Sequence, residues 1–161
     1  MRRLAILLGL AAPLLAGLPS RAHPLADFTA QRVVPEKERQ AVSTTSVDAP
    51  KQSQGILSVR DLGHQPLDAD FPAMEGYQLR LREITVAPGG HIGLHRHEQR
   101  PGLAYMLEGV MVERRGPSFK PRPLHPGEAV FEGTGVIHWW KNSGDKPARA
   151  LVVDVVPEES P

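Results

Sequence analysis

Residues 89–97 have the sequence GGHIGLHRH and follow a strand-like run that ends in a Pro-Gly turn. His95 and His97 are two positions apart, a spacing that places both imidazoles on the same face of a β-strand. In a helix the same spacing would separate the two side chains by about 200°. If these residues form a strand, the two histidines can therefore share one divalent ion. The alternative interpretation is a pair of partly exposed strand histidines.

A third histidine occurs in a similar context. His138 begins a short strand-like run within the sequence GEAVFEGTGVIHWWKN, residues 127–142. Three neutral imidazoles on neighbouring strands form a facial site for Fe, Mn, Cu, Ni or Zn and leave open positions for water or a substrate. The sequence therefore predicts a metal site made by His95, His97 and His138.

The rest of the chain beyond Gly55 consists of short strand-like runs separated by turns that contain Gly, Pro, Asn or Asp, such as the one at residues 87–90. The expected strands are residues 56–60, 77–86, 91–97, 103–114, 118–124, 129–131, 136–141 and 148–156. The 15 Gly and 16 Pro residues argue against a helical bundle. About eight regularly spaced strands favour an all-β fold, a sandwich or a barrel.

Two of these runs differ in their pattern of apolar residues. From Tyr77 to Arg82, apolar and polar residues alternate, so we expect one face to pack and the other to meet water. Residues 150–156 are apolar almost throughout, which predicts a strand that is covered on both faces.

Composition excludes several classes of function. The 19 Lys and Arg residues are balanced by 18 Asp and Glu residues, so the chain has no basic field of the kind that binds nucleic acid. Cysteine is absent, which rules out disulfides, thiolate metal sites and a cysteine nucleophile.

The N-terminal residues predict export. Arg2 and Arg3 precede an apolar run at residues 4–18, and small and polar residues follow, as in a secretory signal peptide. We expect cleavage after Ala22 and a periplasmic or secreted protein with no stable membrane insertion; a retained N-terminal anchor is the alternative. Cleavage there would leave His23 as an N-terminus able to chelate copper. Residues 23–54 are polar and predict an arm or linker, and residues 55–157 form the β-domain.

The two histidine segments resemble the motifs of the cupin superfamily, G-x5-H-x-H and G-x5-P-x-G-x2-H-x3-N. Gly89, His95 and His97 fit the first motif, which closes at Gly109. The second motif is matched at the positions Gly127, Gly135, His138 and Asn142. The resemblance covers residues 77–156 and implies a double-stranded β-helix, or jelly-roll, barrel with a divalent metal ion and a small-molecule ligand. It also implies a homodimer, in which the arm of one chain could wrap around its partner.

The sequence departs from the family pattern at two positions. Gly102 stands where the family has its acidic metal ligand, and Gly133 replaces a proline of the second motif. We therefore expect a three-histidine site without an anionic ligand, in which a bound ion would be a stronger Lewis acid but held less tightly. Glu98 could substitute, although it should point away from the site as the strand neighbour of His97. Complete loss of metal binding is the other alternative.

Four further residues are candidates for the lining of the pocket. His91 is an even number of positions from the motif histidines and would point to the same face of a strand. The alternative is a solvated position near the turn. Tyr105 is expected to fill the barrel interior, where it could donate a hydrogen bond to a substrate. Parity with His138 selects Trp140 for the interior, as pocket wall or as core. Arg100 could meet an anionic substrate at the mouth, or be a solvated loop residue.

The resemblance leads to two hypotheses for function. The first is a metal-dependent enzyme that acts on a small molecule, either dioxygenase-like or of an isomerase type. The second is a non-catalytic periplasmic module that binds or senses a small molecule or a metal. The apparent lack of a further Asp or Glu near the histidines, which could serve as a general base, favours the second hypothesis.

Overall fold

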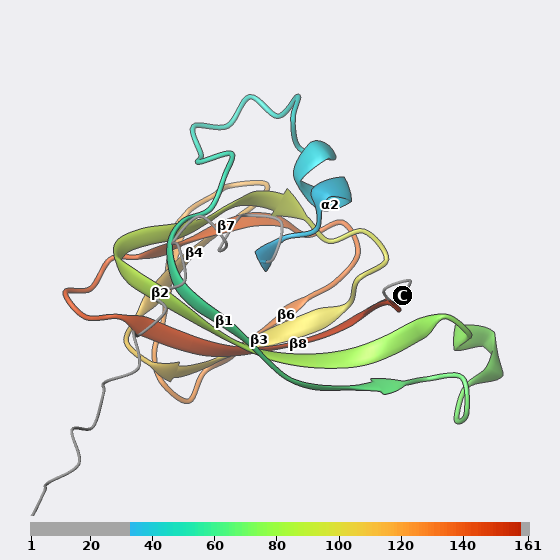
Figure 1. The fold of residues 1–161 in the computed structure, drawn as a ribbon. Helices are drawn as coiled ribbons and strands as arrows, with labels where there is room; N and C mark the ends of the chain where they lie inside the picture. Colours follow the sequence, from blue (N-terminus) through green and yellow to red (C-terminus); the bar gives the residue numbers. More distant parts are fainter. Residues whose placement is uncertain (1–32, 159–161) are drawn as a thin grey trace, which may run out of the picture.

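The computed structural model describes residues 33–158, so the predicted signal peptide and the first part of the predicted arm lie outside the described residues. These residues form a nearly closed antiparallel β-barrel (Figure 1). Its strands are β1 (Gln54–Pro66), β2 (Tyr77–Arg96), β3 (Gly102–Glu108), β4 (Met111–Arg115), β5 (Pro121–Leu124), β6 (Ala129–Glu132), β7 (Ile137–Asn142) and β8 (Ala148–Pro157). A short helix α2 (Glu36–Gln40) precedes β1, and a 3-10 turn η2 (Pro72–Met74) joins β1 to β2.

The strands run in the order β5-β4-β7-β2-β8-β3-β6, and β1 pairs with β2 in addition to this order. Every pairing is antiparallel. The predicted all-β jelly-roll barrel of about eight strands is confirmed. Within residues 33–158, no helix is long and apolar enough to cross a membrane.

Two of the differences from the predicted strand boundaries lie at glycine-containing positions. The expected turn at residues 87–90 is wrong, because residues 77–96 form the single strand β2, which bends there with Gly89 at a φ of 73°. The bend lets β2 pair with β8 through its first half and with β7 through its second half. The expected strand at residues 103–114 is divided at Gly109, where a Cβ would lie 2.8 Å from the Cα of Ala148.

The alternation from Tyr77 to Arg82 is present, but its faces are the reverse of the prediction. Leu79 is 39% exposed, whereas Arg82 is only 4% exposed and lies inside the barrel. The reason is a buried acceptor on the neighbouring strand, because Asp154 of β8 is the register partner of Arg80 and binds both arginines. The inward face of β2 is therefore polar near the mouth of the barrel.

The hydrophobic core fills the barrel behind that polar mouth. Strand β8 buries alternate residues, and Leu151, Val153 and Val155 between them are only half-buried, so the expectation that both of its faces are covered is wrong. The core side chains are Ile56, Ile84, Val86, Ala104, Met106, Met111, Leu124, Val130, Trp140, Ala148 and Val152. Val33 and Val34, which precede α2, belong to the same cluster.

Residues 33–53, here called the arm, lie at the open end of the barrel that Figure 1 shows beneath α2. Two hydrogen bonds from backbone N–H groups of β2 hold the arm. The Leu94 N–H donates to the carbonyl of Pro50 at 2.7 Å, and the Gly93 N–H donates to Oγ of Ser53 at 3.0 Å. The arm thus runs from the mouth of the barrel along β2 into β1.

Candidate metal centre

The three predicted histidines meet inside the barrel. His95 lies on β2 directly opposite His138 of β7 in the antiparallel register. His97 follows the end of β2, where its backbone exchanges hydrogen bonds with Gly135 and Val136 at 2.9 and 2.8 Å. The Nε2 atoms of the three rings are 3.1 to 3.2 Å apart. All three side chains are buried, with exposed fractions of 4% or less.

The outer nitrogen of each ring has its own hydrogen-bond acceptor. Nδ1 of His95 donates to the carbonyl of Gly93 at 2.9 Å, and Nδ1 of His97 donates to the carbonyl of Arg100 at 3.1 Å. Nδ1 of His138 donates to Oε1 of Glu113 at 2.7 Å. In a neutral imidazole with its proton on Nδ1, the Nε2 lone pair is free. All three lone pairs therefore point at one another.

Burial keeps these imidazoles neutral. It lowers the pKa of His97 to about 4, and it lowers the pKa values of His95 and His138 well below their usual range, with the neighbouring histidines adding to the effect. Three converging lone pairs repel unless a cation lies between them. Two nitrogens bound at about 2.1 Å, at right angles on one ion, are about 3.0 Å apart. The donor set therefore fits a divalent metal ion.

A carboxylate that the sequence interpretation missed lies beside the three rings. Glu132, at the end of β6, places Oε2 at 3.5 Å from Nε2 of His97 and Oε1 at 3.6 Å from Nε2 of His138. Its side chain is buried, and burial raises the pKa of Glu132 to about 7. The cluster that could hold a metal thus consists of the three predicted histidines, with an acidic neighbour, Glu132, that the sequence interpretation did not foresee.

The position of Glu132 explains why Gly102 is tolerated. The two residues are register partners in the β3–β6 pair, and directly paired residues of antiparallel strands project to the same face. A Cβ on Gly102 would lie 2.5 Å from the carbonyl oxygen of Val153, so the backbone of β8 leaves no room for a side chain there. The carboxylate thus comes from the neighbouring strand. The signal in the sequence was Glu132 at the end of a predicted strand in the second motif.

Glu98, the substitute considered from the sequence, lies elsewhere. It is partly exposed and pairs with Nη1 of Arg96 at 3.5 Å, on the outer side of the barrel rim. This agrees with the expectation that a strand neighbour of His97 points away from the histidines.

A small cavity of about 50 Å³ adjoins the histidines. Its polar lining includes His95, Glu132 and Arg100, and its apolar lining includes Trp140. The indole of Trp140 packs edge-on against the His138 ring, with centroids 5.7 Å apart. Two of the predicted pocket residues, Trp140 and Arg100, are therefore brought to the site.

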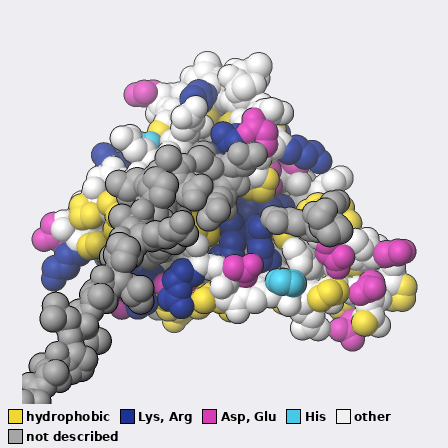
Figure 2. Space-filling model, in the orientation of Figure 1, with side chains coloured by type: hydrophobic (Ala, Val, Ile, Leu, Met, Phe, Trp, Pro, Cys, Tyr) yellow, Lys and Arg dark blue, Asp and Glu magenta, His cyan; other side chains and the backbone are white. Residues whose placement is uncertain are grey.

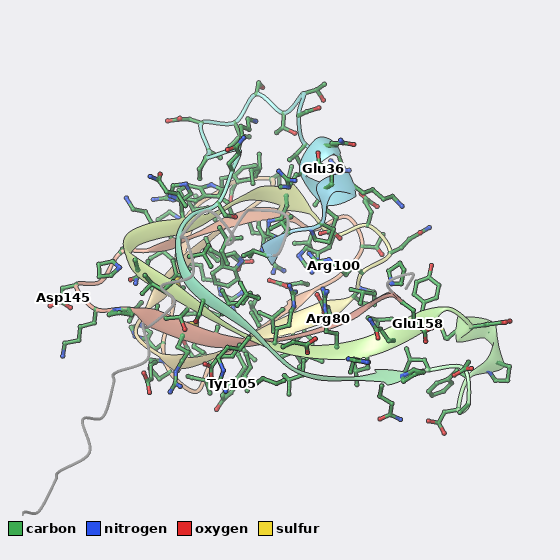
Figure 3. The ribbon with its side chains drawn as sticks, in the orientation of Figure 1. Glu36, Arg80, Arg100, Tyr105, Asp145 and Glu158 are labelled. Atoms are coloured by element: carbon green, nitrogen blue, oxygen red, sulfur yellow. The ribbon has the colours of Figure 1, made fainter. Side chains whose placement is uncertain are left out.

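The other two predicted pocket residues are not brought to the cavity. Tyr105 is 38% exposed and points away from the barrel interior (Figure 3), because Ala104 and Met106 occupy the inward positions of β3. His91 is half-buried beside Lys141 and is absent from the described cavity lining. A register irregularity between Ile92 and His95 breaks the parity on which that prediction depended.

Comparison with known proteins gives a family model and several curated relatives that are similar to this chain. A family model described as a cupin domain matches residues 82–154. Germin-like protein 1 from Brassica napus is 30% identical over 87 residues, which cover 52% of this chain and 42% of the relative. The auxin-binding protein ABP19b from Prunus persica is 26% identical over 52% of this chain and 41% of its own length. The matched part of the chain thus spans about two fifths of these curated relatives.

One solved structure with a similar fold is that of KdgF from Halomonas sp. It superposes with a TM-score of 0.50 at 18% identity, covering 67% of this chain and 87% of its own. At this level of identity the likeness concerns the fold alone.

Proposed function

We propose, from the premise that this chain belongs to the cupin superfamily, that His95, His97, His138 and Glu132 bind one divalent transition-metal ion for oxidoreductase chemistry on a small molecule. The observation that carries this proposal is the convergence of three unprotonated Nε2 atoms within 3.2 Å of one another. Imidazole and carboxylate together suit Fe, Mn, Cu, Ni and Zn. The reaction type that we propose is dioxygenase-like.

A bound ion would supply Lewis acidity and, if it is redox-active, one-electron chemistry. The protein's own residues would hold the site rigid and limit its access to water. Glu113 fixes the tautomer and orientation of His138 through a buried hydrogen bond, an arrangement that raises the basicity of a ligand imidazole. The Glu132 carboxylate would offset part of the positive charge of the ion. Apolar side chains form most of the remaining cavity wall.

The alternative function is a non-catalytic binding module. The apparent lack of carboxylates near the histidines favoured it, but Glu132 and Glu113 both lie within 3.6 Å of a histidine ring nitrogen. With Glu132 beside the open side of the cluster, the centre has a group that can hold a proton as well as bind a metal ion. This observation supports the enzyme over the binding module.

The ligand set is tested by metal content and metal affinity. We expect about one equivalent of metal in the purified wild-type protein and none in His138→Ala. Glu132→Gln should bind the ion more weakly, and Glu98→Gln is the matched control that should behave as wild type. Elemental analysis and competition with a chelator give both quantities. A wild-type protein that remains metal-free after reconstitution, or equal affinities for the two glutamine variants, would contradict the assignment.

Turnover separates the enzyme from the binding module. Small hydroxy and keto acids are offered to the metal-loaded protein in an oxygen electrode, with His138→Ala as the blank. Substrate-dependent oxygen consumption would support the dioxygenase-like reaction. Ligand binding in calorimetry without oxygen consumption or a new product would support the binding module instead.

We also propose that the protein acts outside the cytoplasm, on the evidence of the apolar run that follows Arg2 and Arg3. N-terminal sequencing of protein recovered from a periplasmic fraction should begin at His23. Recovery only from the cytoplasm, with Met1 retained, would contradict export.

A further inference from the structure

A second buried polar cluster lies at the mouth of the barrel, and Asp154 is its centre. Arg80 binds both carboxylate oxygens of Asp154 at 3.1 Å, and Nη2 of Arg82 binds Oδ2 at 2.8 Å. Nη1 of Arg100 binds the same Oδ2 at 2.7 Å. Asp154 is 1% exposed and Arg100 is 4% exposed. Figure 2 shows Lys and Arg side chains gathered in the middle of this face.

The remaining edge of Arg100 binds a carboxylate from the arm. Nε donates to Oε1 of Glu38 at 2.8 Å, and Nη2 donates to Oε2 at 2.5 Å. Two parallel bonds of this kind are the geometry by which an arginine recognises a carboxylate. Glu38 itself is 2% exposed, on a helix whose neighbouring glutamate, Glu36, faces outward (Figure 3).

Arg100 lies between two spaces. On the inside it lines the cavity of about 50 Å³ that also contacts His95 and Glu132. On the outside it lines a cleft of about 280 Å³ between α2 and the rim, together with Lys37, Tyr77 and Arg80. A small molecule that moves from solvent toward the histidines by this route therefore passes the guanidinium of Arg100.

The arm closes that route. Val33 and Val34 form part of the wall of the inner cavity and are almost completely buried. One water needs about 10–15 Å³ of such space, so the cavity has room for only a few waters while the arm is in place. An organic ligand can reach the histidines through this mouth only if the arm moves.

The arm has the features of a segment that can move. Its helix α2 has five residues and no side-chain hydrogen bond at its N-cap, Pro35. Helices of this length do not form in isolation, so α2 depends on its contacts with the barrel. The ion pair of Glu38 with Arg100 is one of these contacts, and a competing carboxylate can replace it.

We propose that Nε and Nη2 of Arg100 form a carboxylate-binding site. In the closed protein Glu38 occupies this site. A small carboxylate ligand occupies it after displacing residues 33–42. The site takes a ligand whose carboxylate pairs with Arg100 while its other end faces the histidines. This names the substrate class of the proposed function, and it rests on that function only where the ligand is treated as a substrate. The exchange of one carboxylate for another requires no metal.

The test uses malonate as the ligand and neutral malonamide as its control, with metal-free protein. Calorimetry measures affinity in wild type, Glu38→Gln and Glu36→Gln, the last being a matched change on the exposed side of α2. Trypsin cleavage after Lys37 and Arg39, followed by mass spectrometry, reports displacement of the arm.

We expect Glu38→Gln to bind malonate about tenfold more tightly than wild type, because the internal competitor no longer reduces the population of the open state. Glu36→Gln should match wild type. Malonate, but not malonamide, should accelerate cleavage after Lys37 and Arg39 in wild type. Equal malonate affinity in wild type and Glu38→Gln, or cleavage unaffected by malonate, would overturn the proposal. The wild-type cleavage series decides the question if Glu38→Gln does not fold.

The same measurements on His138→Ala separate the two proposals. If His138→Ala still responds to malonate although it binds no metal, the carboxylate site stands on its own. If wild type binds metal but malonate neither binds nor releases the arm, the carboxylate site is wrong and the metal centre remains.

Discussion

Two buried polar clusters share one barrel, and they are satisfied in opposite ways. At the mouth, Asp154 faces three guanidinium groups at 2.7 to 3.1 Å and Glu38 pairs with one of them, so that opposite charges meet. Deeper inside, three neutral imidazoles turn lone pairs toward one another at 3.1 to 3.2 Å. The first cluster is completed by the chain itself. For the second, we propose that a cation from outside completes it.

The difference indicates a division of roles. A buried ion-pair network is strongly disrupted when one partner is removed, because the others become uncompensated charges. A cluster of neutral acceptors keeps its geometry through the hydrogen bonds of the outer ring nitrogens, which are independent of the central ion. We therefore expect the mouth to govern folding and access, and the histidine cluster to govern metal binding.

Asp154→Asn should have the largest effect, because it removes the shared negative charge of the mouth. We expect a loss of about 3–5 kcal/mol in the free energy of unfolding, the range for breaking a buried ion pair. Urea unfolding of metal-free protein measures it. The matched control is Asp145→Asn, an exposed change in the turn between β7 and β8. A loss in Asp154→Asn no larger than in this control would contradict the role of the mouth in stability.

Acid should weaken the histidine cluster through the imidazoles. The folded pKa of His97 is about 4, below its unfolded value of 6.5, so the unfolded chain binds more protons as the pH falls between these values. His97 alone then costs roughly 3 kcal/mol of stability between pH 6.5 and pH 4. Glu132 acts in the opposite direction, because its raised folded pKa of about 7 favours the folded state as the pH falls from 7 to 4.5.

As the pH falls, the stability lost through the three histidines should exceed the stability gained through Glu132. Metal-free protein should therefore be less stable at pH 5 than at pH 7. Tryptophan fluorescence during urea unfolding follows this. His97→Asn should reduce the loss of stability on acidification, and His125→Asn, at an exposed loop position, should leave it unchanged. Identical pH profiles for the two variants would show that the buried imidazoles do not control the acid response.

Glu113→Gln should weaken the proposed metal site without changing its ligand atoms. The carboxylate holds Nδ1 of His138 at 2.7 Å, and loss of such a partner lowers metal affinity by roughly 10–100-fold. Competition with a chelator measures the change. Glu108→Gln, on the exposed end of β3, is the control and should retain wild-type affinity. Unchanged affinity in Glu113→Gln would mean that the orientation of His138 is fixed by β7 alone.

The sequence predicts the histidine cluster because its residues follow local rules. Two histidines two positions apart and a third near a turn can be read from spacing alone. The register then places His95 opposite His138, and His97 comes directly after the end of β2. The mouth is harder to predict, because Arg82 looks like the solvent face of an alternating strand. It lies inside only because Asp154, more than seventy residues later, is placed beside it by the β2–β8 register.

Glu132 was missed for the same reason. Glu132 lies opposite Gly102 because β6 pairs with β3. The alternation of side chains within a single strand gives no information about that pairing. Counting alternate positions along a strand also gave the wrong face where tertiary contacts decide which side chains point inward. This was the case for Tyr105 on β3 and for His91 near the irregular β2–β7 register. Local chemistry was thus predictable, whereas neighbours set by register were not.

Gly102→Ala tests the point where the two clusters meet, with the smallest expected effect. Gly102 pairs with Glu132 on β6 and with Asp154 on β8, and an added Cβ would lie 2.5 Å from the carbonyl oxygen of Val153. Because β8 must shift to admit a methyl group, we expect a loss of about 1 kcal/mol in stability. Metal affinity should fall less than in Glu113→Gln, since Glu132 moves only with its strand. Gly133→Ala, where a Cβ meets nothing within 4 Å, is the control. If Gly102→Ala matches it in stability and affinity, the close approach of β8 is not what keeps a side chain out of position 102.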